Sequence, residues 1–361
     1  MIQGQETRKK RVVVAMSGGV DSSVAAALLK NKGYEVIGMT MCFNLTDPQK
    51  KKPNCCGPQG INDARRIAGI LGIRHYVLNM QPHLEKYVID NFCQEYLKGR
   101  TPNPCVRCNQ YLKFDVLLKK ALAQEAQYLA TGHYARILKC AKGYALKKGK
   151  DKIKDQSYFL YRLNQEQLKH ALFPLANYTK QEVRKLAAKF KLPVAEKLAS
   201  QEICFLPTLD YREFLQSRFK QGLQSGPIVD QEGRLLGQHK GIAFYTIGQR
   251  EGLGIARGYP VYITAINLEK NEITVGKKED AYSSEFIIRQ PHFILNPVKK
   301  KIAAGVRIRY NHKEAPAQIF AFAEMLRVKF KQPQFAITCG QSAVFYQKDK
   351  VLGGGVIDEV L

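Results

Sequence analysis

Residues 11–32 read RVVVAMSGGVDSSVAAALLKNK, and this stretch decides the fold of the N-terminal half of the chain. Residues 11–16 form a short, β-branched run suited to a buried strand. Residues 21–32 then place apolar side chains on one helical face, and Gly33 is suited to end that helix. A strand, a glycine-rich turn and a helix in this order predict an α/β domain.

The same alternation continues to about residue 131. We expect further strands at 35–43, 74–78 and 128–131, and further helices at 61–71, 84–97 and 110–124. This rhythm predicts a doubly wound, parallel sheet with helices on both faces. Residues 139–154 interrupt it with a run of lysines, which predicts either a solvated loop or hairpin or a patch that contacts phosphate.

The composition changes beyond about residue 207, where Gly, Pro and β-branched residues become frequent. Short strands are expected at 243–247, 261–267, 272–275, 304–308, 318–321 and 343–346. Strands at such spacing are typical of all-β domains. We therefore predict an α/β domain over residues 1–206 and β-rich domains over residues 207–284 and 285–361.

The overall charge favours a polyanionic partner. The chain has 361 residues, 57 Lys and Arg against 31 Asp and Glu, and a net charge of +26. Such an excess attracts nucleic acid. A membrane surface is less favoured, because no basic amphipathic helix and no long apolar run is visible.

Cysteine use points to a reducing compartment. The nine cysteines are an odd number, and the polar N-terminus does not resemble a signal peptide. Both features argue against a secreted disulfide framework, so we expect a cytoplasmic location in which cysteines serve metal binding or redox chemistry.

Residues 15–23, AMSGGVDSS, are suited to bind phosphate. Two glycines let the backbone N–H groups approach an anion, and the following helix directs its positive end to the same place. Ser17, Ser22 and Ser23 add hydroxyl groups, and Asp21 is suited to cap the helix or to hold Mg²⁺. The spacing fits neither a Walker A loop nor G-x-G-x-x-G. The alternative is a plain capped turn. The pattern resembles the PP-loop of ATP pyrophosphatases, which implies adenylation of a carbonyl oxygen with release of pyrophosphate.

A second candidate site lies in residues 99–114, GRTPNPCVRCNQYLKF. Pro102 and Pro104 predict an extended loop. Cys105 and Cys108 follow at C-x-x-C spacing, where Arg107 and a helix starting near residue 109 favour a thiolate.

A third cysteine, Cys204, lies in residues 199–205, ASQEICF. Three interpretations are open for these thiols: half of a structural zinc site, a three-cysteine iron–sulfur centre, or a catalytic pair. We prefer the catalytic pair.

Six strings in order carry a more specific resemblance: AMSGGVDSS, GRTPNPCVRCN, ATGHYAR, KDQSYFLYRL, SQEICF and YTIGQREGLGI. From about residue 11 to residue 361 the chain resembles the tRNA-specific 2-thiouridylases of the MnmA type. The resemblance implies a PP-loop domain (1–206), a small β-rich central domain (207–284) and a C-terminal β-barrel-like domain (285–361).

The resemblance also implies a mechanism. ATP with Mg²⁺ would adenylate the C2 oxygen of the wobble uridine, Cys204 would carry sulfur as a persulfide, and Cys108 would be the nucleophile. Both possible sulfur routes end in a Cys108–Cys204 disulfide that must be reduced. An alternative for the same reaction is an iron–sulfur cluster on Cys105, Cys108 and Cys204. The implied ATP contacts are Ala15, Met16, Ser17, Gly18, Gly19, Val20, Asp21, Ser22, Met41 and Gly132.

The implied partners are tRNA, at its anticodon loop, and a persulfide donor protein such as a cysteine desulfurase or a relay protein. Residues carried over as contacts to tRNA or its target base are Asn103, Pro104, Cys105, His133, Lys154, Asp155, Gln156, Arg309, Tyr310 and Gln341. One departure matters: many family members have Asp, a proposed base, where this chain has Cys105. The identity of the base is therefore left open.

Overall fold

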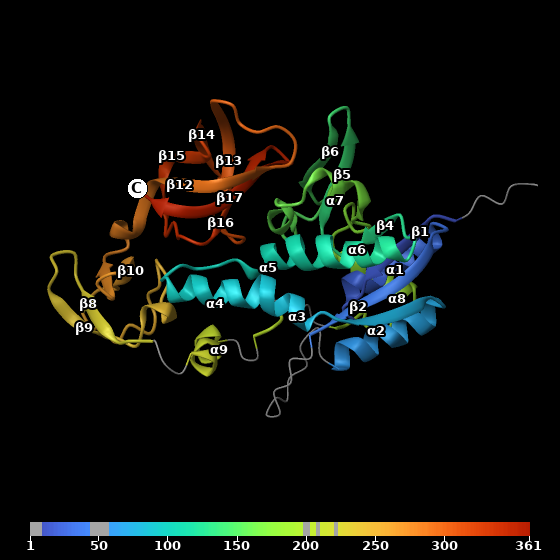
Figure 1. The fold of residues 1–361 in the computed structure, drawn as a ribbon, viewed down its shortest axis with the longest axis horizontal. Coiled ribbons are helices and arrows are strands. Elements are labelled where there is room, and N and C mark those ends of the chain that lie inside the picture. Colours follow the sequence, from blue (N-terminus) through green and yellow to red (C-terminus); the bar gives the residue numbers. More distant parts are fainter. Residues whose placement is uncertain (1–8, 44–57, 198–202, 207–209, 220–222) are drawn as a thin grey trace, which may run out of the picture. The chain divides into compact units, whose positions relative to one another are not determined.

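The computed structural model describes residues 9–43, 58–197, 203–206, 210–219 and 223–361 (Figure 1). The chain forms two compact units. The first combines residues 1–87 with 106–207, and the second combines 88–105 with 208–361. The segment 88–105 thus belongs to the same unit as the C-terminal part of the chain. The domain boundaries near residues 207 and 284 stay a prediction.

A five-stranded parallel sheet in the order β3-β2-β1-β4-β7 forms the centre of the first unit. Its strands are β1 (Arg11–Ala15), β2 (Glu35–Cys42), β3 (Arg74–Asn79), β4 (Tyr128–Ala130) and β7 (Ala171–Leu172). The β-branched run of β1 lies between β2 and β4, where Val13 pairs with Ile37 on one side and Leu129 on the other. The predicted parallel sheet is confirmed.

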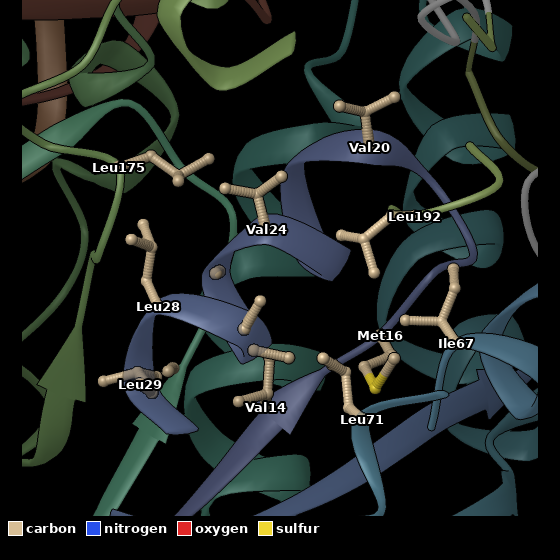
Figure 2. Close-up of a cluster of buried hydrophobic side chains, with 14 of the residues drawn as sticks. Val14, Met16, Val20, Val24, Leu28, Leu29, Ile67, Leu71, Leu175 and Leu192 are labelled. Atoms are coloured by element: carbon tan, nitrogen blue, oxygen red, sulfur yellow. The ribbon is translucent and has the colours of Figure 1, made fainter. Parts of the chain in front are cut away.

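Helices follow these strands. They are α1 (Val20–Asn31), α2 (Pro58–Leu71), α3 (Gln81–Leu84), α6 (Leu118–Ala123), α7 (Gln165–His170) and α8 (Lys180–Lys189), with the π-helical η1 (Glu85–Ile89) and η2 (Cys108–Leu117) and the 3-10 helix η3 (Ser157–Leu160). The helix α1 packs against α2 and α8. Figure 2 shows its apolar side chains meeting those of the neighbouring elements: Val14, Met16, Val20, Val24, Leu28, Leu29, Ile67, Leu71, Leu175 and Leu192. This core fixes the position of the first turn of α1.

The lysine-rich stretch forms an antiparallel hairpin. Strand β5 (Ala135–Cys140) pairs with β6 (Gly143–Lys148). Lys139 and Lys142 are exposed at the hairpin end. Of the two interpretations of this run, the surface hairpin is therefore confirmed, and contact with phosphate stays a prediction.

The prediction of an extended loop across Pro104 is wrong. Pro104 is the first residue of helix α5 (Pro104–Arg107), which continues into η2 at Cys108. Proline is tolerated in the first turn of a helix, because its missing N–H has no intrahelical acceptor there. Cys105 and Cys108 therefore lie on a helical run and not before one.

The second unit contains helices α4 (Asp90–Leu97) and α9 (Tyr211–Arg218), whose rings Tyr96 and Tyr211 stack with centroids 4.4 Å apart. It also contains a four-stranded sheet in the order β10-β11-β8-β9. These strands are β8 (Gly226–Val229), β9 (Leu235–His239), β10 (Tyr262–Asn267) and β11 (Glu272–Gly276).

The strand predicted at residues 243–247 is wrong. The segment instead begins with the 3-10 helix η4 (Ile242–Phe244), whose three residues are buried. A short apolar run does not distinguish a buried strand from a buried turn. A further 3-10 turn, η5 (Glu279–Ala281), precedes the last strands.

Six antiparallel strands close into a barrel at the C-terminal end, in the order β12-β15-β14-β13-β16-β17 with β17 pairing back to β12. They are β12 (Tyr282–Phe293), β13 (Lys301–Arg307), β14 (Ala315–Phe322), β15 (Met325–Phe335), β16 (Ser342–Gln347) and β17 (Lys350–Val360). Buried side chains such as Phe286, Ile319, Val328 and Phe345 fill its interior. The predicted C-terminal β-barrel is confirmed.

Candidate nucleotide and cysteine site

Two features fix the turn after β1: a backbone hydrogen bond to β2, and a close approach of Gly18 to α2 that only glycine permits. Met16 N donates to Met39 O at 2.8 Å, which ties the turn to β2. Gly18 has φ +70°, and a Cβ there would lie 2.2 Å from the carbonyl oxygen of Gly60. Gly19 is the N-cap of α1, and no side chain caps that helix. The expectation that Asp21 caps the helix is therefore wrong, because Asp21 already lies inside its first turn.

Two of the three serines of the turn stabilise it from within. Ser22 Oγ accepts from Ser17 N at 3.2 Å and lies 3.1 Å from the carbonyl oxygen of Gly19, to which it donates. Ser23 Oγ donates to the same oxygen at 2.7 Å. Ser22 and Ser23 are buried, whereas Ser17 is exposed. Of the three serines of this turn, Ser17 is thus the one that faces solvent.

Asp21 binds two groups from distant parts of the chain. Lys180 Nζ lies 2.6 Å from Oδ1 and 2.7 Å from Oδ2 of Asp21. The hydroxyl of Tyr134 donates to Oδ1 at 2.7 Å. Neither Lys180 nor Tyr134 was expected at this site. The available signals were ATGHYAR for Tyr134 and, for Lys180, the helix-start pattern Thr-x-x-Glu that surrounds it.

A second lysine reaches the same turn. Lys197 Nζ donates to the carbonyl oxygen of Gly18 at 3.3 Å and pairs with Asp63 Oδ2 at 2.7 Å. Asp63 lies on α2, close to the Gly18 backbone. The candidate phosphate-binding turn therefore has two ammonium groups close to it, although its own sequence, residues 15–23, contains no lysine.

The strand ends bring two further expected residues to this edge of the sheet. Gly132, just after β4, lies so close to α1 that a Cβ would be 2.8 Å from the backbone carbon of Asp21 and 2.9 Å from Ser22 N. Met41 lies near the end of β2, two residues beyond the partner of Ala15. Residues 15–22 and Gly132 are thus brought together, as expected from the carboxyl ends of parallel strands.

His133 is a buried, neutral side chain. Its Nδ1 lies 2.6 Å from Thr131 Oγ1, and its ring packs edge-on against Phe173 with centroids 5.8 Å apart. Burial, followed by the charge of Lys113, holds the pKa of His133 well below its usual range. The imidazole therefore acts near neutral pH only as a neutral hydrogen-bonding group.

The segment KDQS is held from within the first unit. Asp155 Oδ1 accepts from Gly149 N at 3.1 Å and Oδ2 accepts from Ser157 Oγ at 2.9 Å, and the side chain is buried. Gln156 Oε1 accepts from Tyr134 N at 3.1 Å. Lys154 remains half-buried. Gln156 thereby holds the segment between β4 and β5 that carries His133 and Tyr134, and Asp155 holds the segment after β6.

Cys108 and Cys204 both belong to the first unit, and both are half-buried. Cys108 begins η2, and Asn109 beside it is buried, with Nδ2 donating to the carbonyl oxygen of Phe159 at 3.4 Å. Arg107 Nε donates to Tyr87 O at 2.7 Å. Within the described ranges, no three His, Cys, Asp or Glu side chains gather in a way that would hold a metal ion.

In the second unit, Gln341 holds the chain that leads to Asn103, Pro104 and Cys105. Its Nε2 donates to the carbonyl oxygens of Thr101 at 3.0 Å and of Pro102 at 3.4 Å. Gln341 and this segment were expected at one site, and the structure brings them together.

Arg309 and Tyr310 lie in the turn after β13. Arg309 Nη1 donates to the carbonyl oxygen of Ala336 at 3.5 Å. The guanidinium of Arg307, two residues earlier, lies 5.7 Å from the Tyr310 ring centroid. Arg307 is therefore a cation close to the Tyr310 ring that the sequence analysis did not name.

Comparisons with known proteins cover nearly the whole chain. Residues 10–208 match the family described as tRNA methyl transferase HUP domain, 212–277 its PRC-barrel domain, and 283–357 the aminomethyltransferase β-barrel domain. The chain is 50% identical over 355 residues to the tRNA-specific 2-thiouridylase MnmA 1 of Syntrophus aciditrophicus, covering 98% of this chain and 94% of that protein. It is 51% identical over 356 residues to tRNA-specific 2-thiouridylase MnmA of Moorella thermoacetica, covering 96% and 99%.

A solved structure, the U34-tRNA thiolase NcsA of Methanococcus maripaludis with its [4Fe-4S] cluster, overlaps 60% of this chain and 67% of its own at 18% identity. Its TM-score of 0.35 is too low to support a conclusion about this chain. In the part of the chain that the structure describes, no helix has the length and apolar character needed to cross a membrane.

Proposed function

The chain belongs to the tRNA-specific 2-thiouridylase family, and we propose that it uses ATP to replace the C2 oxygen of the wobble uridine of tRNA with sulfur. The observation that carries this proposal is an identity of 50% across 98% of the chain to a curated relative of that name. The net charge of +26 suits a tRNA substrate. The iron–sulfur alternative is not favoured, because the described side chains include no three that gather as metal ligands.

The first step is adenylation of the base. The C2 oxygen of uridine attacks the α-phosphorus of ATP, a new O–P bond forms, and the bond from the α-phosphorus to the bridging oxygen breaks. Pyrophosphate leaves with that electron pair, and the attached AMP makes the C2 oxygen a leaving group. We assign the ATP contacts to residues 15–22, Met41 and Gly132, where a turn, a helix start and two strand ends converge.

We infer that ATP is used together with Mg²⁺, which would supply positive charge that offsets the charge of the phosphates. Asp21 does not fit a magnesium ligand as it stands, because both of its carboxylate oxygens contact Lys180 Nζ. No step of the proposal depends on that metal.

The second step moves sulfur. A donor protein such as a cysteine desulfurase or a relay protein loads Cys204 as a persulfide. In one route the terminal sulfur attacks C2 and displaces AMP, and Cys108 thiolate then attacks the Cys204 sulfur, leaving both electrons of the broken S–S bond on the sulfur attached to C2. In the other route Cys108 attacks first and releases sulfide, which then attacks C2. Both routes form a Cys108–Cys204 disulfide, and a dithiol, or two external thiols, restores the pair with two electrons and is itself oxidised to a disulfide.

We propose that the target base and its flanking nucleotides contact the following residues: Asn103, Pro104, Cys105, His133, Lys154, Asp155, Gln156, Arg309, Tyr310 and Gln341. The neutral state of His133 supports a role as hydrogen-bonding partner of an uncharged base. A reducing cytoplasm would keep the catalytic thiols available between turnovers.

The test is a thiolation assay with purified protein, a tRNA transcript, ATP and a desulfurase with cysteine. Wild type should form 2-thiouridine and release pyrophosphate only when tRNA is present. Cys108→Ser and Cys204→Ser should form none, yet should still release pyrophosphate. Cys140→Ser is the matched control, since Cys140 is exposed at the hairpin end. Full thiolation by Cys108→Ser or Cys204→Ser, or pyrophosphate release that ignores tRNA, would contradict the proposal.

A further inference from the structure

The phosphate turn contains a carboxylate at the place where a polyanion is expected to bind. Asp21 lies in the first turn of α1. An unpaired negative charge there would repel ATP, because Coulomb repulsion is strong in a partly buried site. The motif SGGVDSS supplies no cation of its own. Lys197, which also reaches the turn, pairs with Asp63 and not with Asp21. The group that neutralises Asp21 therefore contributes strongly to the charge that a phosphate meets.

Lys180 is the residue that neutralises Asp21. Its ammonium group contacts both oxygens of Asp21, at 2.6 Å and 2.7 Å, and its side chain is only 15% exposed. Tyr134 donates a further hydrogen bond to Asp21 at 2.7 Å. These residues all belong to the first unit.

Hydrogen bonds at the start of α8 hold the Lys180 backbone in position beside Asp21. Thr179 and Glu182 form a capping box around it, and Lys180 N donates to Asp151 Oδ2 at 2.9 Å. Immobilising a lysine costs about 2 kcal/mol of rotamer entropy. Because this cost is met when the chain folds, the Lys180 ammonium group is already in place before a phosphate binds.

We propose that Lys180 is a phosphate-binding cation of this turn, oriented by Asp21, whose carboxylate is held in turn by Tyr134. The inference rests on the proposed adenylation. When the bond between the α-phosphorus and the bridging oxygen breaks, the departing pyrophosphate gains negative charge, and the Lys180 ammonium stabilises it without transferring a proton. Preorganised charge of this kind is most valuable where charge develops in the transition state.

The alternative is that Lys180 only neutralises Asp21 and maintains the turn. The two roles differ in one combination of substitutions. If Lys180 only offsets the charge of Asp21, the double variant Asp21→Asn/Lys180→Met should be as fast as Asp21→Asn alone. If Lys180 stabilises pyrophosphate, the double variant should be slower than Asp21→Asn alone.

The experiment measures tRNA-dependent pyrophosphate release by the full-length protein, with kcat and the KM for ATP determined separately. Lys180→Met should lower kcat by roughly 10²-fold, the effect typical of losing one preorganised charge-stabilising group. Lys180→Arg should retain a substantial part of the rate. Lys185→Met is the matched control, an exposed lysine on the same helix, and should retain the wild-type rate.

Each outcome decides the inference. A wild-type rate in Lys180→Met, or a double variant as fast as Asp21→Asn alone, would overturn it. A slow Lys180→Met protein with an unchanged melting temperature supports it, and Lys180→Arg gives the answer if the methionine variant does not fold. Failure of the wild type to release pyrophosphate with tRNA would instead refute the proposed function itself.

Discussion

The side chain of Gln341 donates a hydrogen bond to the backbone carbonyl oxygen of Thr101 at 3.0 Å, and to that of Pro102 at 3.4 Å. Thr101 N in turn donates to the carbonyl oxygen of Cys339 at 2.9 Å. The barrel turn at residues 339–341 and the segment before α5 are therefore joined by one backbone hydrogen bond and by the bonds of the Gln341 side chain to backbone oxygens. This arrangement positions Asn103 and Cys105 from the barrel side.

Gln341→Leu should lower thiolation through misplacement of that segment. Two neutral hydrogen bonds are lost. Each is worth about 1 kcal/mol, so a fall of up to about 30-fold in kcat/KM for tRNA is expected. The measurement is initial thiolation rate against tRNA concentration. Gln347→Leu, at an exposed glutamine on β16, is the control. An unchanged kcat/KM in Gln341→Leu would show that the segment keeps its place without these bonds.

Arg100 ties the same segment to α4 and to β17 by charged contacts. It pairs with Glu95 at 2.8 Å and Asp358 at 3.2 Å and donates to the carbonyl oxygen of Ile357 at 3.0 Å. Arg100→Met should destabilise the second unit by about 1–3 kcal/mol, because Glu95 and Asp358 lose a half-buried partner. Thermal unfolding measures the effect. Lys119→Met, which removes an exposed i,i+4 pair with Asp115, should leave the melting temperature unchanged.

The sequence predicts the part of the site that depends on local pattern. The β-branched run of β1, the glycines of the turn and the apolar face of α1 are neighbours in sequence, so their geometry follows from backbone rules. Lys180 and Tyr134 were missed because they lie 159 and 113 positions from Asp21, and no local pattern specifies that pairing.

Two barrel strands, β15 and β17, were not predicted from the sequence. The pattern of β15 was present but overlooked, and that of β17 is weak. In β15, Leu326, Val328 and Phe330 are buried and alternate with exposed lysine and arginine, a period of two that identifies a strand. In β17, residues 353–355 are glycines, which weaken the strand pattern. Closure of β17 onto β12 depends on pairing between residues about 70 positions apart, which a local pattern does not contain.

Gly132→Ala should damage the nucleotide turn. The added Cβ would lie 2.8 Å from the Asp21 backbone, so α1 and the end of β4 must separate. Overpacking of this kind costs about 1–3 kcal/mol, and we also expect a raised KM for ATP. Thermal unfolding and ATP titration of pyrophosphate release measure the two effects. Gly69→Ala is the control, since nothing lies within 4 Å of a Cβ there, and it should not destabilise the protein. Equal melting temperatures for the two variants would contradict the close approach.

His133 should make the folded protein sensitive to acid. Burial lowers its pKa in the folded state, whereas the unfolded chain has an ordinary value of about 6.5. Below that value the unfolded state binds more protons, so stability that is fully present at higher pH is lost as the pH falls through about 6.5 toward the folded-state pKa. His133→Gln should therefore show a smaller fall in melting temperature between pH 8 and pH 5.5 than wild type.

Comparing the melting temperatures of one protein at the two pH values separates the effect of His133 protonation from the effect of altered packing. At pH 8 neither state of wild type is protonated at His133, so the difference in melting temperature there reports only the changed contacts with Thr131 and Phe173. Some pH dependence should remain in His133→Gln, because burial also lowers the pKa of His75. An identical pH dependence in wild type and His133→Gln would mean that the His133 imidazole accepts its proton in the folded state, and a neutral partner for the base would then have to be sought elsewhere.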